Sequence, residues 1–184
     1  MSKHFFILVL FAFVHPTFSQ YSDPEKINWP PEYEPANSKF YVQNEIHINA
    51  GPEIVWGFLI DALKWESWYE GAENVSIVNQ EDNVLKENSI FRWKTMGLNL
   101  ESEIRQYEPN KLLAWESKKN SIQAYHVWLI VPTENGCLVI TEETQNGWLT
   151  FFEKIFQPGK LKRLHDIWLA ELKIKSENDQ SALK

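Results

Sequence analysis

From about residue 73 to residue 146, polar and apolar residues alternate with a period of two, and this pattern constrains the fold more than any other feature. Such alternation is typical of half-buried β-strands. It predicts strands near residues 74–80, 89–96, 98–107, 112–118, 122–131 and 137–146. Short turns join them into consecutive hairpins, so the sheet is expected to be antiparallel.

The segments on either side of this region complete the expected fold. Residues 39–48 alternate as a further strand, and Pro52 with Glu53 then opens a helix, because both residues favour a first helical turn. Residues 149–176 carry apolar side chains at helical spacing, with a break or kink at Pro158-Gly159. One long helix covers only one face of a sheet. We therefore expect an α+β fold in which a curved sheet wraps around the C-terminal helix.

The inner face of the sheet can be inferred because paired residues share a face. Phe91 and Trp93 alternate with Arg92, which places the aromatic side chains inside. A two-residue turn at Met96-Gly97 would pair Trp93 with Leu100, Phe91 with Ser102 and Arg92 with Glu101. The charged pair on the outside supports this register.

The later hairpins extend the same argument. A turn at Asn110-Lys111 pairs Gln106 with Trp115, and a type I′ turn at Asn135-Gly136 pairs Trp128 with Glu143 and His126 with Gln145. The loop around Lys119-Asn120 leaves two alternatives open. An even loop turns His126 and Trp128 inward, whereas an odd loop turns inward a more apolar set, Tyr125, Val127 and Leu129.

With the even loop, the inner face forms an aromatic basin that carries a few polar groups. The expected ligand pocket consists of Phe91, Trp93, Ser102, Gln106, Trp115, His126, Trp128 and Glu143. Apolar walls with a few placed polar atoms are typical of ligand sites. The alternative is a filled core, but a glutamate and a glutamine are costly to bury there without partners.

The N-terminal residues predict export. Residues 5–14 are an unbroken apolar run, followed by small residues that suit cleavage near Ser19/Gln20. The run is too short for a permanent membrane span. We expect a signal peptide at 1–19, a proline-rich arm at 20–38, a ligand-binding domain at 39–177 and a tail at 178–184, in a periplasmic or secreted protein.

Composition excludes several classes of function. The net charge is −7 without any basic run, which argues against nucleic-acid binding. The lone Cys137 cannot form an intrachain disulfide and is expected to be a buried strand residue. His47, His126 and His165 show no metal-ligand spacing, and no glycine-rich phosphate loop is present. We expect neither a metal nor a cofactor, and a monomer.

Several segments, in order, resemble the START-like (SRPBCC) superfamily, in its polyketide cyclase/dehydrase and lipid-transport branch. The resemblance lies in Ile46 to Trp56, Asp61 with Trp65 and Trp68, Tyr107 to Trp115, Gly136 to Glu143 with Gly147, and Leu172-Lys173 with Glu177. It implies a helix-grip (Bet v 1-like) fold, in which a seven-stranded antiparallel sheet grips the C-terminal helix over a hydrophobic cavity. The export signal and the Pro158-Gly159 break depart from the pattern of polyketide cyclases.

Three functions are consistent with these features. The favoured one is a non-catalytic binder or carrier of a small hydrophobic, aromatic or lipid-like ligand. The alternative is a cyclase or dehydratase that uses His126 and Glu143 as an acid–base pair, since such a pair on one face can share a proton. The third is an interaction protein with a vestigial cavity, which no residue pattern specifically supports.

Overall fold

The computed structural model describes residues 27–182, so the predicted signal peptide at 1–19 lies outside the described residues. Seven antiparallel strands form one sheet in the order β1-β7-β6-β5-β4-β3-β2. The strands are β1 (Phe40–Ile48), β2 (Glu73–Ile77), β3 (Ile90–Thr95), β4 (Leu98–Glu108), β5 (Leu112–Lys119), β6 (Ile122–Thr133) and β7 (Gly136–Asn146). The expected sheet is confirmed, with its chain order and its antiparallel hairpins.

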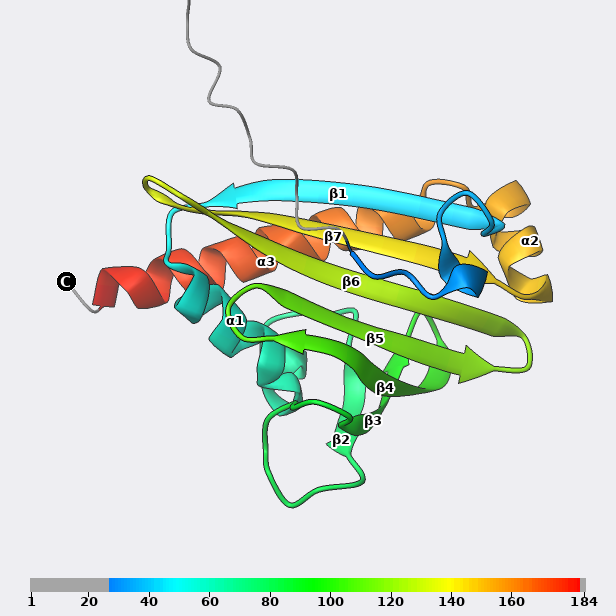
Figure 1. Cartoon of the computed structure of the whole chain (residues 1–184), viewed down its shortest axis with the longest axis horizontal. Coiled ribbons are helices and arrows are strands. Elements are labelled where there is room, and N and C mark those ends of the chain that lie inside the picture. The colour runs from blue at the N-terminus through cyan, green and yellow to red at the C-terminus, as the bar shows by residue number, and fades with distance from the viewer. Residues whose placement is uncertain (1–26, 183–184) are drawn as a thin grey trace, which may run out of the picture.

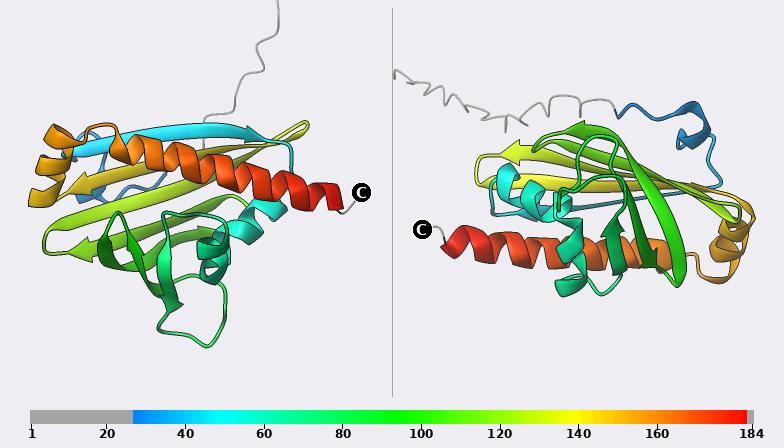
Figure 2. Two further views of the ribbon diagram at one scale, coloured as in Figure 1. Left: turned by 180° about the vertical axis from the view of Figure 1, so that it is seen from behind. Right: turned by 90° about the horizontal axis from the view of Figure 1, so that it is seen from below.

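The helices lie on the concave side of the sheet (Figures 1 and 2). They are α1 (Pro52–Ile60), α2 (Trp148–Phe156) and α3 (Lys160–Ala182), with the short 3-10 turn η2 (Ala62–Ser67). The 3-10 turn η1 (Pro31–Tyr33) lies on the outer face instead. The helix α3 crosses beneath the sheet from β1 toward α1. The curved sheet gripping a long C-terminal helix is therefore confirmed.

The break at Pro158-Gly159 separates α2 from α3, as the sequence indicated. The helix α3 continues to Ala182, beyond the expected end near residue 176, so the described part of the expected tail is helical. Within residues 27–182, none of the helices is both long enough and apolar enough to cross a membrane.

The β3–β4 hairpin has the predicted register, with Trp93 opposite Leu100 and Arg92 opposite Glu101. Met96 and Gly97 adopt φ angles of 54° and 81°, as a two-residue turn of this type requires. Arg92 and Glu101 form the expected exposed ion pair, at 2.8 Å.

The predicted register of β4 with β5 is wrong. Ile104 lies opposite Trp115, Gln106 lies opposite Ala114, and Arg105 is an extra residue between them. Such a β-bulge reverses the alternation of the strand beyond it. Gln106 is consequently on the outer face and does not belong to the inner basin.

The even loop between β5 and β6 is confirmed, because Lys119 pairs with Ile122 and Trp115 with His126. The predicted turn at Asn135-Gly136 is wrong by one residue. Thr133 pairs with Gly136, and His126 therefore lies directly opposite Glu143.

A second apolar cluster on the outer face explains why Tyr125, Val127 and Leu129 are so apolar. The N-terminal arm covers them: Tyr33 stacks on Tyr125 at a ring separation of 5.4 Å, and Trp29 lies 5.5 Å from the same ring. Gln106 also holds the arm, since its amide donates to the Asn28 carbonyl oxygen at 3.1 Å. Both faces of β6 are therefore buried.

We expect Gly136→Ala to lower the free energy of unfolding by about 2–3 kcal/mol. Gly136 has a φ of 146°, and an added Cβ would lie 2.1 Å from the carbonyl oxygen of Ile48. The matched control is Gly57→Ala in α1, where a Cβ meets no atom within 4 Å. That variant should be neutral or more stable, because alanine favours helix. Urea unfolding measures both changes, and equal stabilities would contradict the close contact.

Candidate functional site

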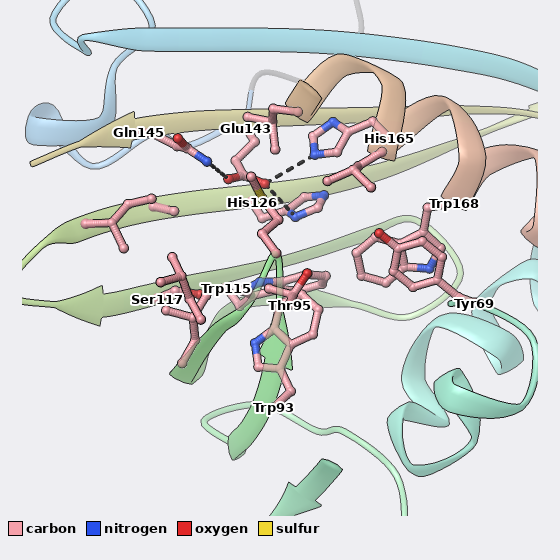
Figure 3. Close-up of a pocket in the computed structure, with 17 residues that line it drawn as sticks. Tyr69, Trp93, Thr95, Trp115, Ser117, His126, Glu143, Gln145, His165 and Trp168 are labelled. Atoms are coloured by element: carbon pink, nitrogen blue, oxygen red, sulfur yellow. Dashed lines mark hydrogen bonds and ion pairs between the residues drawn. The ribbon is translucent and has the colours of Figure 1, made fainter. Parts of the chain in front are cut away.

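A cavity of about 40 Å³ lies between the inner face of the sheet and α3 (Figure 3). One wall is aromatic and one end is polar. The partly exposed residues of its lining form the rim: Thr95, Met96, Leu98, Leu100 and Leu164. The cavity is therefore entered between the β3–β4 turn and the first turns of α3.

Trp168 of α3 is the centre of the aromatic wall. Its ring stacks on Tyr69 with a centroid separation of 4.3 Å and an interplanar angle of 5°. The rings of Trp93 and Trp115 lie 5.9 Å and 6.2 Å from it. Tilted and stacked aromatic pairs at such separations are favourable beyond the burial of their surface.

Glu143 is the centre of the polar end. Its Oε2 lies 3.1 Å from Nδ1 of His126 and 3.2 Å from Nε2 of His165. The amide of Gln145 donates to Oε1 at 2.6 Å. Glu143 comes from β7, His126 from β6 and His165 from α3, so the sheet and the helix together assemble this cluster.

The network defines the ionisation of the cluster. Burial alone would raise the pKa of Glu143, but hydrogen bonds from His126 and His165 outweigh it, and the pKa of this carboxyl is lowered. Burial lowers the pKa of His126 to about 4, against the opposing effect of Glu143. At neutral pH, Glu143 is ionised and His126 is neutral.

An ionised carboxylate only accepts hydrogen bonds, so each histidine nitrogen that faces Glu143 carries a proton. Nε2 of His126 is then an acceptor, and the Thr141 hydroxyl donates to it at 2.7 Å. Nδ1 of His165 is buried and has no hydrogen-bond partner among the described residues. Two further lining atoms are buried without a partner among the described residues: the acceptor Oε1 of Gln145 and the donor Nε1 of Trp168.

Four of the residues predicted for the pocket line this cavity: Trp93, Trp115, His126 and Glu143. Phe91, Ser102 and Trp128 are buried on the same face, but they pack behind the lining. Ser102 accepts the indole N–H of Trp93 at 3.0 Å. Gln106 is the one predicted residue on the wrong face, because of the bulge at Arg105.

The sequence interpretation missed His165, Gln145, Tyr69 and Trp168 as lining residues. A signal for His165 was available, since it falls on the inward stripe of α3: Leu161, His165, Trp168, Leu169, Leu172 and Ser176. A polar residue within such a stripe must find a partner inside the fold. His126, Glu143 and His165 also form a group of three potential metal ligands, whose ligand atoms lie within 4.8 Å of one another.

We expect acid to destabilise the protein through this cluster. An unfolded histidine takes up a proton near pH 6.5, whereas His126 does so only near pH 4. The stabilisation is therefore present above pH 6.5 and is lost as the pH falls toward 4, by an amount on the order of 3 kcal/mol. The lowered pKa of Glu143 extends the loss in the same direction below pH 4.5.

Urea unfolding at a series of pH values tests this expectation. His126→Gln should reduce the change in the free energy of unfolding between neutral pH and the acid range. His47→Gln, which replaces an exposed histidine, should leave this pH dependence as in the wild type. A slope that is the same in the wild type and in His126→Gln would contradict the assignment.

Several solved structures share this architecture. A hypothetical protein from Helicobacter pylori is 26% identical, with a TM-score of 0.77 over 84% of this chain and 98% of its own. The aromatase/cyclase Zhui from a Streptomyces species is 12% identical, with a TM-score of 0.62 over 75% of this chain and 93% of its own. A START superfamily protein from Mycobacterium smegmatis is 14% identical, with a TM-score of 0.56 over 78% and 99%.

At the level of sequence, no curated protein matches the chain. Residues 39–177 do match the family model described as polyketide cyclase/dehydrase and lipid transport, which covers more than half of the chain. Together with the helix-grip fold, this match shows that the chain belongs to the polyketide cyclase/dehydrase and lipid-transport family of the START-like superfamily.

Proposed function

We propose that the protein is an exported, monomeric, non-catalytic binder or carrier of a small hydrophobic ligand that has one polar end. The observation that carries the proposal is the composition of the inner cavity. Aromatic rings form its wall, and an ionised carboxylate lies at its polar end with an unpartnered polar atom on each of His165 and Gln145. Buried polar atoms normally have hydrogen-bond partners, and the hydroxyl or carbonyl group of a ligand would supply the missing ones.

The size of the cavity defines how such a ligand binds. A volume of about 40 Å³ holds about three to four water molecules, at roughly 10–15 Å³ each. Small-molecule sites are usually about 300–1,000 Å³. The ligand therefore needs an opened state, in which the β3–β4 turn and the start of α3 move apart. Met96, Leu98 and Leu164 at the rim are flexible aliphatic side chains that suit this movement.

A specific observation favours acid–base catalysis as a second candidate function. Glu143 contacts His126 and His165 directly, and an ionised carboxylate beside a neutral imidazole can take up and return a proton. A cyclase or dehydratase reaction would use the pair to remove a proton next to a carbonyl and to protonate a departing hydroxyl. The polar end is the same for both functions, so the fate of the ligand distinguishes them.

We expect 2-naphthol, an aromatic ring with one hydroxyl, to quench the tryptophan fluorescence of the wild type. Ala124→Leu should weaken its binding about tenfold to a hundredfold, because Ala124 lines the cavity and the larger side chain fills it. Ala170→Leu is the matched control, since Ala170 is exposed on α3. Equal affinities of the two variants would contradict binding in the cavity.

Native mass spectrometry of the protein from its own host would identify a co-purifying ligand. Recovery of that ligand unchanged after incubation supports the carrier. Loss of one water from it, abolished in Glu143→Gln, would instead support the dehydratase.

Export generates a separate prediction. We expect the mature chain to begin at Gln20, because small residues precede this position after the apolar run of residues 5–14. Intact mass measurement of the protein from the exported fraction of its host tests the cleavage. A full-length chain beginning at Met1 in the cytoplasm would contradict export, and the control is a variant with Phe11→Glu in the apolar run, which should remain uncleaved.

A further inference from the structure

The polar end of the cavity holds two histidines and a carboxylate. Binding one hydroxyl or carbonyl group of a ligand does not require all three side chains. His126, Glu143 and His165 come from three different elements, and their side chains converge (Figure 3). They are 3%, 8% and 2% exposed, so the cluster is assembled inside the fold. Two imidazole nitrogens and one carboxylate oxygen face one another there.

The separations between these atoms suit a metal ion. Ligand atoms about 2.0–2.2 Å from an ion, at tetrahedral or octahedral angles, lie roughly 3.0–3.5 Å apart. The carboxylate Oε2 is 3.1 Å and 3.2 Å from the two nitrogens, and all three atoms lie within 4.8 Å of one another. Coordination of one ion would draw the three atoms closer together than the 4.8 Å within which they now lie.

The hydrogen bonds to the other atoms of these side chains resemble those that surround the ligands of known metal sites. The second nitrogen of a coordinating histidine usually bonds to an oxygen, and the free oxygen of a coordinating carboxylate usually accepts a hydrogen bond. Here Thr141 lies 2.7 Å from Nε2 of His126, and Gln145 donates to Oε1 of Glu143 at 2.6 Å. Neither contact uses Nδ1 of His126 or Oε2 of Glu143. To coordinate an ion through Nδ1, His126 would carry its proton on Nε2, and the Thr141 hydroxyl would then accept it.

Charge favours a cation at the same place. Glu143 is a buried carboxylate, and among the described residues no lysine or arginine lines the cavity. A divalent cation would compensate the carboxylate and replace the two protons that the histidines now share with it.

We propose that His126, Glu143 and His165 form a binding site for a divalent transition-metal ion. Two nitrogens and one oxygen suit zinc, iron, nickel or copper, whereas magnesium and calcium need mainly oxygen ligands. The cavity of about 40 Å³ adjoins all three side chains, so water molecules can occupy the remaining coordination positions. The site does not depend on the proposed hydrophobic ligand, because it needs only these three side chains.

The first experiment uses the tag-free full chain, stripped with a chelator and titrated with Co²⁺. We expect one ion per chain, visible as ligand-field absorption and as quenching of tryptophan fluorescence from Trp115 and Trp168, which also line the cavity. Competition with Zn²⁺ should remove the cobalt absorption. Absence of binding at micromolar concentrations in the folded wild type would overturn the proposal without any variant.

The second experiment locates the ion. His126→Gln, Glu143→Gln and His165→Gln should each weaken Co²⁺ binding at least about a hundredfold, and Gln145→Ala about tenfold to a hundredfold. His47→Gln, at an exposed position, should bind like the wild type. Undiminished binding in all three cluster variants would place the ion elsewhere and overturn the proposal. If a variant does not fold, NMR of the wild type locates the ion instead. On addition of the ion, the imidazole signals of His126 and His165 should shift, and that of His47 should not.

Failure of this site and failure of the proposed ligand site have different signatures. Loss of Co²⁺ binding in the wild type leaves quenching by 2-naphthol unaffected. Conversely, Ala124→Leu should block 2-naphthol while one ion is still bound per chain.

Discussion

The indole of Trp168 connects the long helix to the sheet, and the shape of the interior depends on this contact. It meets Trp65 of η2 at 5.3 Å, Trp128 of β6 at 5.0 Å and Tyr69 at 4.3 Å. A large aromatic side chain buries roughly 150–250 Å², which corresponds to about 4–6 kcal/mol before the cost of ordering the chain. Because one side chain contacts so many elements, it defines how closely α3 approaches the sheet. The cavity is the space that remains beside it.

Burial of the Glu143 carboxylate lowers the stability of the same interior, whereas burial of Trp168 raises it. Removing an ionised group from water costs several kcal/mol, which its hydrogen bonds from two histidines and a glutamine offset. An apolar residue at this position would avoid that cost. A chain that keeps a buried carboxylate, two histidines and unpartnered polar atoms in one place has a composition typical of functional sites.

The fold was predictable from the sequence because each strand carried its own alternation and most turns carried their own signal. The inner positions of Trp93 and Trp115 followed from parity, whereas that of His126 also required the loop near Asn120 to be even. The bulge at Arg105 was not predictable, since one extra residue leaves no mark in composition. Gly136 resembled a turn residue, but its real constraint is the close approach of β1, which only the folded chain contains. The inward stripe of α3 places His165 inside the fold, but its contact with Glu143, 22 residues away in the chain, depends on how α3 packs on the sheet.

The arm of residues 27–38 has a mechanical consequence for the whole molecule. Its rings cover the outer face of β5, β6 and β7, so this half of the sheet is clamped between two apolar layers. Among residues 27–182, no such arm covers the outer face of β2 and β3, where Arg92 pairs with Glu101 and Lys94 with Glu73 at the surface. Bending stiffness is thus unequal across the sheet. Deformation concentrates in the free half, and the rim of the cavity lies on that half.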